Sequence, residues 1–217
     1  INGVTDLFFF SESYIYWGAQ GGWSENDREE LPSSFPEGLA VGLVDKDEYL
    51  DVIISSWMCT ISCGDGNRVF WGSDNGPSGD DSKKIEGAVG VTDIQIADLN
   101  GDGDNDLLLS NGAAGLQGFA DESFIYWGPD FPEGSRLSLP STAASEGAVR
   151  DLDGDGHLDI VLASHYEPNG GGAEVSQIYW GSDGDYTPAS VTELPTQHAA
   201  WMKVVGSVLP SVPPAAP

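Results

Sequence analysis

The chain has 217 residues, which is enough for one sizeable hydrophobic core, either as a single domain or as a compact repeat array. Its 8 Lys and Arg residues against 35 Asp and Glu residues give a formal net charge of −27. Such a surface repels phosphate backbones and anionic headgroups, so we predict cations as partners and no nucleic acid. No apolar run reaches the roughly 20 residues of a membrane span, so we expect no membrane insertion. The 40% hydrophobic content argues against a disordered acidic polymer.

An aromatic-Trp-Gly triplet recurs four times, with its tryptophan at Trp17, Trp71, Trp127 and Trp180. An aspartate that opens a β-prone run precedes each triplet, and a polar turn follows it. Four copies in one register predict a repeat architecture, with units at about 1–38, 39–87, 88–147 and 148–198.

Each unit is typical of four short strands separated by turns. In the third unit we expect these strands at 91–97, 106–110, 123–127 and 136–139. Helical periodicity is absent, and Gly and Pro interrupt the chain too often for long helices. We therefore predict an all-β fold, a β-propeller of about four four-stranded blades. The repeated tryptophan is expected to pack between blades, and ligand stacking is its alternative role.

The two ends of the repeat array predict how the propeller closes. Residues 6–11 align with the second strand of a blade, whereas residues 199–206 stand where a first strand belongs. Pairing of these N- and C-terminal strands, within one chain or between neighbouring chains, would remove free sheet edges. Residues 207–217 are expected to form a Pro-rich tail or linker. Unit four begins at Ala148, which lies only three residues before Asp151, the start of its acidic loop. We therefore expect a very short first strand in this unit.

Two units carry an acidic loop that leads into a β run, at residues 98–106 and 151–159. Ca²⁺ prefers six to eight oxygen ligands, and alternate residues of a tight loop can direct carboxylates at one centre. The first, third, fifth and ninth positions would bind through side chains, and the seventh through its backbone carbonyl. Without a cation these groups would repel one another. An EF-hand is excluded, because its bidentate Glu at position 12 is replaced by Leu109 and Leu162.

The equivalent stretch of unit two, Asp45 to Asp51, looks two residues shorter, lacks both glycines and contains Lys46. We predict that it binds calcium weakly or not at all. Unit one begins inside its own loop, so the first ligands of that loop are missing.

These loops resemble those of the FG-GAP/VCBS repeat family, the calcium-binding propellers that include the integrin α-chain head and that carry such a loop once per blade. The resemblance spans residues 1–206 and implies a propeller fold with two Ca²⁺ sites. The implied ligands are Asp98, Asn100, Asp102, Asp104 and Asp106 in one loop, and Asp151, Asp153, Asp155, His157 and Asp159 in the other. Propellers of this family usually have seven or eight blades, whereas this chain supplies four.

Two cysteines, Cys59 and Cys63, lie four residues apart. This lone pair lacks the second pair of ligands that a structural zinc site needs. A local disulfide and two free thiols both remain open, and an oxidised pair would indicate a secreted protein.

No Ser or Cys nucleophile motif accompanies His157, His165 or His198, so the sequence predicts no enzyme. We expect a secreted or cell-surface structural or adhesive module that self-associates into filaments or surface layers. One alternative is a lectin-like domain that binds cell-surface glycans through exposed aromatics such as Trp23, Tyr166 and Tyr186. The other is a fragment of a polysaccharide-active enzyme.

Overall fold

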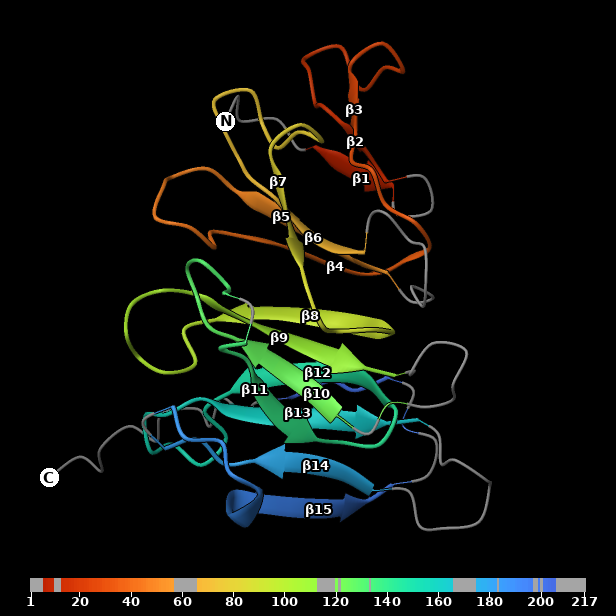
Figure 1. Ribbon diagram of the computed structural model, residues 1–217. Helices are drawn as coiled ribbons and strands as arrows, with labels where there is room; N and C mark the ends of the chain where they lie inside the picture. Colours follow the sequence, from red (N-terminus) through yellow and green to blue (C-terminus); the bar gives the residue numbers. More distant parts are fainter. Residues whose placement is uncertain are drawn as a thin grey trace, which may run out of the picture.

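The structure is a computed structural model that describes residues 6–9, 13–56, 66–112, 120, 122–132, 134–165, 175–182, 184–196, 199 and 201–205. Its strands form antiparallel sheets that follow one another in chain order (Figure 1). The first sheet contains β1 (Leu7–Phe9), β2 (Tyr14–Tyr16) and β3 (Arg28–Glu30). The second contains β4 (Pro36–Gly42), β5 (Asp51–Ser56), β6 (Asn67–Phe70) and β7 (Ser82–Ile85). The third contains β8 (Val91–Ala97), β9 (Asp106–Asn111), β10 (Glu122–Tyr126) and β11 (Leu137–Pro140). The fourth contains β12 (Ala144–Arg150), β13 (Asp159–Ser164), β14 (Val175–Tyr179) and β15 (Val191–Pro195), with the short 3-10 helix η2 (Pro188–Ser190) before β15.

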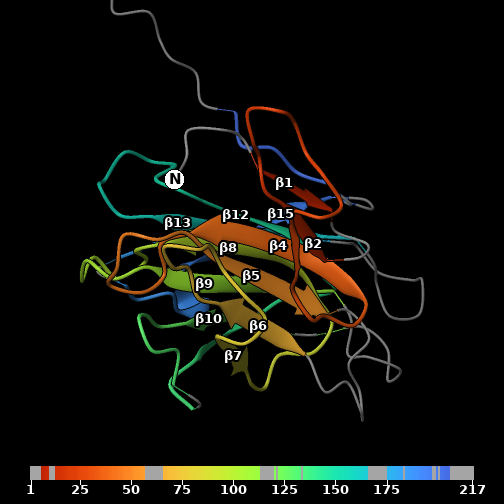
Figure 2. The same cartoon turned by 90° about the horizontal axis from the view of Figure 1, so that it is seen from above.

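Each full sheet is a meander in which consecutive strands are neighbours, and the sheets stack face to face. The first strands β4, β8 and β12 lie over one another when the stack is seen from above (Figure 2). The first and fourth sheets lie at opposite ends of the stack in Figure 1. The strands thus link neighbouring sheets: β4 and β5 contact β8, and β8 and β9 contact β12.

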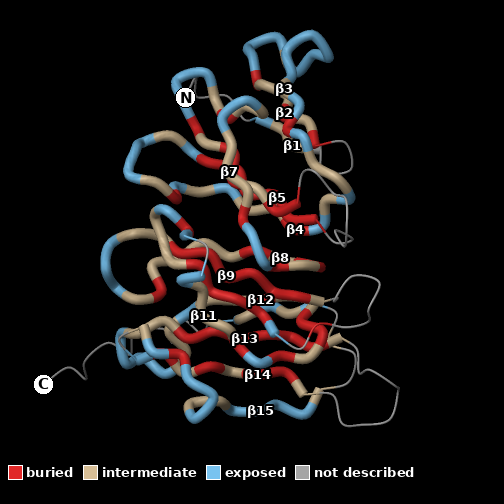
Figure 3. Tube along the Cα trace, in the orientation of Figure 1, coloured by how far each residue is buried: buried red, intermediate tan, exposed pale blue. Residues whose placement is uncertain are grey.

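The second strands β5, β9 and β13 run through the interior and are buried at every residue (Figure 3). Because side chains alternate between the two faces of a strand, one strand supplies two cores. Leu107 and Leu109 pack into the cluster between the second and third sheets, whereas Leu108 packs into the cluster between the third and fourth. This two-sided burial explains the continuous apolar run after each repeated aspartate.

Three of the repeated tryptophans pack against the clusters between sheets, as predicted. Trp17 lies against the core of the first and second sheets, Trp71 against the next core and Trp127 against the last. Trp180 follows β14 of the last sheet, and its indole Nε1 donates a hydrogen bond to Thr192 Oγ1 at 2.8 Å. The role of the first three tryptophans as packing residues between repeats is therefore confirmed.

The all-β prediction is confirmed, and the antiparallel sheets are consistent with propeller blades. Among the residues that the structure describes, the first sheet has three strands, and no strand joins it to the fourth sheet. No helix in the same residues is long and apolar enough to cross a membrane.

The expectation of a very short first strand in unit four is wrong. β12 has seven residues, as many as β8. The sequence Glu-Gly-Ala ends at both Ala88 and Ala148, and equating these two positions misplaces the start of the strand in unit four. In the structure Ala148 lies inside β12, whereas Ala88 lies before β8 begins.

Candidate metal centre

The two acidic loops connect the first and second strands of their sheets. Residues 98–106 join β8 to β9, and residues 151–159 join β12 to β13. Ala97 pairs with Asp106, and Arg150 pairs with Asp159, so each loop begins and ends on a closed ladder. This anchoring holds the two ends of the loop together and lets the intervening residues turn tightly.

In the fourth sheet, the loop gathers three carboxylates. Asp151, Asp153 and Asp159 each offer an oxygen that lies within 4.8 Å of the other two. Asp159 is buried and Asp151 half-buried, whereas Asp153 is exposed. Hard oxygen donors at this spacing fit Ca²⁺, whose bonds to oxygen are about 2.3–2.6 Å long.

Hydrogen bonds from the loop's own backbone orient these carboxylates. Asp151 accepts the N–H of Gly154 at 2.7 Å and that of Gly156 at 3.1 Å. Both glycines have positive φ, 82° and 95°, which explains why this turn carries glycine at these two positions. Asp153 accepts the N–H of Asp155 at 3.1 Å. The carboxylates are thus positioned by the turn itself.

The loop of the third sheet follows the same template. Asp98 accepts the N–H groups of Asp102 at 3.1 Å and Gly103 at 3.0 Å, and Asn100 accepts that of Asp102 at 3.0 Å. An amide oxygen from Asn100 takes the place of the Asp153 carboxylate. On the side facing the second sheet, Lys46 Nζ lies 3.1 Å from an oxygen of Asp104.

The ninth-position aspartates have a structural role that the sequence reading missed. Asp106 accepts the N–H of Leu99 and the N–H of Gly128, each at 2.8 Å. Asp159 accepts those of Leu152 at 2.8 Å and Gly181 at 2.9 Å. A carboxylate has about four lone-pair sites, so both groups can also face a cation. Each of these aspartates ties its loop to the glycine of the aromatic-Trp-Gly triplet.

The same hydrogen bond from the triplet glycine to the repeated aspartate occurs in the first two units, where no complete calcium site is expected. The recurrence of this aspartate in all four units is the sequence signal that could have revealed its structural role. Asp51 accepts the N–H groups of Val44 and Gly72, both at 2.8 Å, and Asp6 accepts that of Gly18 at 2.7 Å. Burial raises the pKa of Asp51 and of Asp106, and the backbone N–H donors partly oppose that shift. The aspartate that recurs in all four units therefore stabilises the fold, including in the units where no calcium binding is expected.

The second loop is not two residues shorter, which corrects that expectation. Gly42 pairs with Asp51 just as Ala97 pairs with Asp106, so the loops have equal length. Counting from the first acidic residue, Asp45, makes this loop look shorter than it is. In the structure, exposed Leu43 stands in place of Asp98, and Asp45 in place of Asn100. The first ligand position is apolar, which supports the prediction of weak or absent calcium binding.

Of the aromatics proposed to stack on sugars, Tyr186 is buried, at 2% exposure, so that role is wrong for it. Its hydroxyl donates to the carbonyls of Leu99 at 3.1 Å and Leu158 at 2.7 Å, which joins the third sheet to the fourth. Burial raises its pKa. Trp23 is 49% exposed. Tyr166, both cysteines, His198 and residues 207–217 lie outside the described residues.

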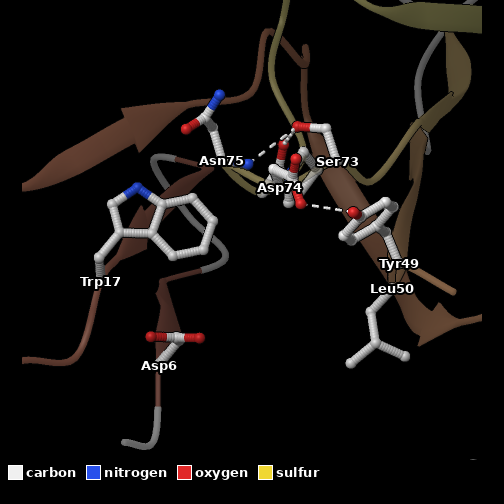
Figure 4. A pocket seen from close by; sticks show the side chains of 9 residues that line it. Asp6, Trp17, Tyr49, Leu50, Ser73, Asp74 and Asn75 are labelled. Carbon is white, nitrogen blue, oxygen red and sulfur yellow. Dashed lines mark hydrogen bonds between the residues drawn. The ribbon is translucent and has the colours of Figure 1, made fainter. Parts of the chain in front are cut away.

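A pocket of about 490 Å³ lies between the first and second sheets, beside Trp17, Tyr49 and Asp74 (Figure 4). The Tyr49 hydroxyl donates a hydrogen bond to the Asp74 carboxylate, which raises the pKa of Tyr49. The loop after Trp71 has the same length as that after Trp180, and Pro77 stands where Tyr186 stands. Proline is smaller than tyrosine. The space that Tyr186 fills between the third and fourth sheets therefore stays open at Pro77, between the first and second sheets.

No curated protein matches the chain. The FG-GAP repeat family model matches residues 143–179, which run from the turn before β12 to the end of β14. The match includes the whole loop from Asp151 to Asp159. The match therefore covers β12 to β14 with their cluster of three carboxylates, and over these residues it confirms the predicted resemblance to the FG-GAP repeat.

Proposed function

We propose that the protein is a non-enzymatic, calcium-binding β-propeller module that acts outside the cell as a structural or adhesive unit. The observation that carries this proposal is the position of Asp151, Asp153 and Asp159 within 4.8 Å of one another, on a loop that lies inside the FG-GAP match. A second site of the same template is proposed at Asp98, Asn100 and Asp102.

Calcium would act by stabilising the folded state. In a chain of net charge −27, carboxylates that lie this close repel one another unless a cation shares them. A site with free calcium at ~100 times its dissociation constant gains about 2.7 kcal/mol of folding stability. Extracellular fluid supplies such calcium concentrations, which supports an extracellular setting, and FG-GAP repeats are typical of extracellular proteins.

The FG-GAP repeat is a structural kind of module, which supports a role without catalysis. The glycan-binding alternative is weakened, because Tyr186, one of its proposed stacking residues, is buried in the core. No described feature favours the polysaccharide-active enzyme, and the structural or adhesive role is the function that we propose.

Thermal unfolding with and without a calcium chelator tests the proposal. Chelation should lower the melting temperature of the parent, and the fall should be smaller in an Asp98→Ala/Asp151→Ala double variant. An Asp45→Ala/Asp47→Ala variant of the second loop is the matched control, and it should respond to chelation as the parent does. An unchanged melting temperature of the parent would refute calcium binding.

A further inference from the structure

The acidic loop of the third sheet contains an asparagine that directly precedes a glycine, Asn100–Gly101. In such a pair the backbone nitrogen of the glycine can attack the side-chain amide carbon of the asparagine, because glycine has no Cβ to obstruct the approach. The structure describes two other pairs of this kind, Asn75–Gly76 and Asn111–Gly112, whereas Asn2 and Asn169 lie outside the described residues. Since the three described pairs have the same two residues, the fold decides how their reactivities differ.

The glycine nitrogens of these pairs differ in whether they donate a hydrogen bond. The N–H of Gly76 donates to the carbonyl of Ser73 at 2.9 Å, and that of Gly112 donates to the carbonyl of Gly90 at 3.0 Å. Among the described residues, nothing accepts the N–H of Gly101. A nitrogen whose N–H donates a hydrogen bond must lose that bond before it attacks. The nitrogen of Gly101 has no such bond to lose.

Comparison with the fourth sheet explains why the Gly101 N–H has no acceptor. In that loop Asp151 accepts the N–H of Gly154, the residue equivalent to Gly101, at 2.7 Å. In the loop of the third sheet, Asp98 instead accepts the N–H groups of the two residues that follow Gly101. The bond that holds the glycine nitrogen in one loop is therefore missing from the other.

Two hydrogen bonds orient the side-chain amide of Asn100. The backbone N–H of Asp102 donates to Asn100 Oδ1 at 3.0 Å, and Asn100 Nδ2 donates to the Asp102 carboxylate at 3.0 Å. The first bond stabilises the negative charge that develops on Oδ1 when a nitrogen adds to the amide carbon. The amide is thus activated by a donor of its own loop.

Free space and solvent also distinguish this pair from the other two. A Cβ built on Gly101 would meet no atom within 4 Å, and Gly101 is exposed. A Cβ on Gly76 would lie 2.2 Å from the Trp17 ring, and Asn111 is buried at 3% exposure. A cyclic intermediate needs room at the glycine and water for its hydrolysis, and the third loop provides both.

We propose that Asn100 is a site of spontaneous deamidation in the folded protein. The nitrogen of Gly101 loses its proton and bonds to Cγ of Asn100, and the bond from Cγ to Nδ2 breaks so that the amide nitrogen leaves as ammonia. Water then hydrolyses the cyclic succinimide. Opening at Cγ leaves an aspartate at residue 100, and opening at the main-chain carbonyl leaves an isoaspartate. Water replaces ammonia, and nothing is oxidised or reduced.

The modification changes the loop in two ways. The aspartate product has the carboxylate that Asp153 supplies in the fourth sheet, and it adds one negative charge to a chain of net charge −27. The isoaspartate product routes the main chain through Cγ and so lengthens the loop between Asp98 and Asp106. The inference uses the hydrogen bonds of the loop and no bound ion, so it and the calcium proposal can fail independently.

Peptide mapping by mass spectrometry tests the proposal on the full chain, incubated with a chelator below its melting temperature. Replacement of the amide by a hydroxyl raises the mass of a peptide, and heavy-oxygen water marks the change as hydrolysis. Asn100 should convert roughly tenfold faster than Asn75 and Asn111, because one hydrogen bond fewer has to break. Equal rates at the three residues, or an Asn100 that keeps its amide, would overturn the proposal.

Incubation in urea separates the effect of the fold from that of the sequence. Unfolding removes the bonds that hold the other two glycine nitrogens, so Asn75 and Asn111 should then convert about as fast as Asn100. A preference for Asn100 that persists in urea would show that the fold does not cause it. Asn100→Gln is the matched control, because the longer side chain closes a ring far less readily. Its peptide should keep its mass, and a mass increase in this variant would assign the reaction to Asn105 instead.

Discussion

A glycine follows the tryptophan of each triplet because two constraints meet at that residue. Its N–H donates to the repeated aspartate, and its Cα lies against a backbone carbonyl at the end of the acidic loop. A Cβ on Gly181 would lie 2.0 Å from the carbonyl oxygen of Leu158, and one on Gly128 would lie 2.0 Å from that of Asn105. The triplet is thus a packing device that needs both the aromatic ring and the absence of a side chain.

Gly181→Ala should destabilise the protein by about 1–3 kcal/mol, the usual cost of forcing extra atoms into a packed site. Gly21→Ala is the control, because a Cβ there meets no atom within 4 Å. Urea unfolding of both variants measures the difference. Equal stabilities of the two variants would mean that the contact with Leu158 does not constrain residue 181.

Asp51→Ala should cost about 2–4 kcal/mol, because the N–H groups of Val44 and Gly72 would lose their buried acceptor. Since Asp51 belongs to the loop without expected calcium, the loss should be the same with and without chelator. Chemical denaturation in both conditions tests this. A loss that disappears on chelation would assign Asp51 to a metal site instead.

Stability at alkaline pH should depend on Tyr179. Burial raises the pKa of Tyr179 to about 12, above the value of 10.0 in the unfolded chain. Between these two values the unfolded chain releases the proton and the folded chain keeps it, so stability is full below pH 10 and falls as the pH rises towards 12.

Denaturation midpoints at pH 9 and pH 11 would show this fall, and Tyr179→Phe should make it smaller. That variant also loses the hydrogen bond from the hydroxyl to the carbonyl of Pro140, at a cost of about 1 kcal/mol at neutral pH. Identical alkaline slopes for parent and variant would exclude Tyr179 as the group responsible.

At the scale of elements, the second strands were the most predictable part of the fold. An aspartate followed by a continuous apolar run locates β5, β9 and β13, because these strands are buried on both faces. The expected ranges in the third unit differ from β8 to β11 by no more than one residue at either end. Local composition determines these strands.

The errors arose where one residue type has two roles. If the recurring aspartate is interpreted only as a calcium ligand, the second loop is matched to the other two from its first acidic residue, Asp45, rather than from its last, Asp51. An alignment from Asp51 would have placed Leu43 at the first ligand position. Tyr186 could not be placed from the sequence, because its burial depends on the carbonyl of Leu99, which lies 87 residues away.

Protection from hydrogen exchange should follow this division of elements. Amides of β5, β9 and β13 should exchange most slowly, since every residue of these strands is buried. Amides of β1 to β3 should exchange fastest, because these strands have three residues each and pack on one neighbouring sheet. Mass spectrometry of exchanged peptides measures both, and the reverse order would contradict the proposed packing.

The whole molecule combines a repeated apolar stack with a strongly acidic surface. Each interior sheet shares a core with two neighbours, and folding stability is distributed along the stack as in other repeat proteins. Carboxylates gather at the loops between the first and second strands of the sheets. A divalent cation in these loops would offset repulsion where it is strongest, which is the central claim of the proposed function.

Calorimetric titration of the metal-free protein with CaCl₂ tests that claim most directly. Two bound ions per chain are expected for the parent, one each for Asp98→Ala and Asp151→Ala, and none for the double variant. A parent that shows no saturable heat, or a double variant that still binds two ions, would contradict the account.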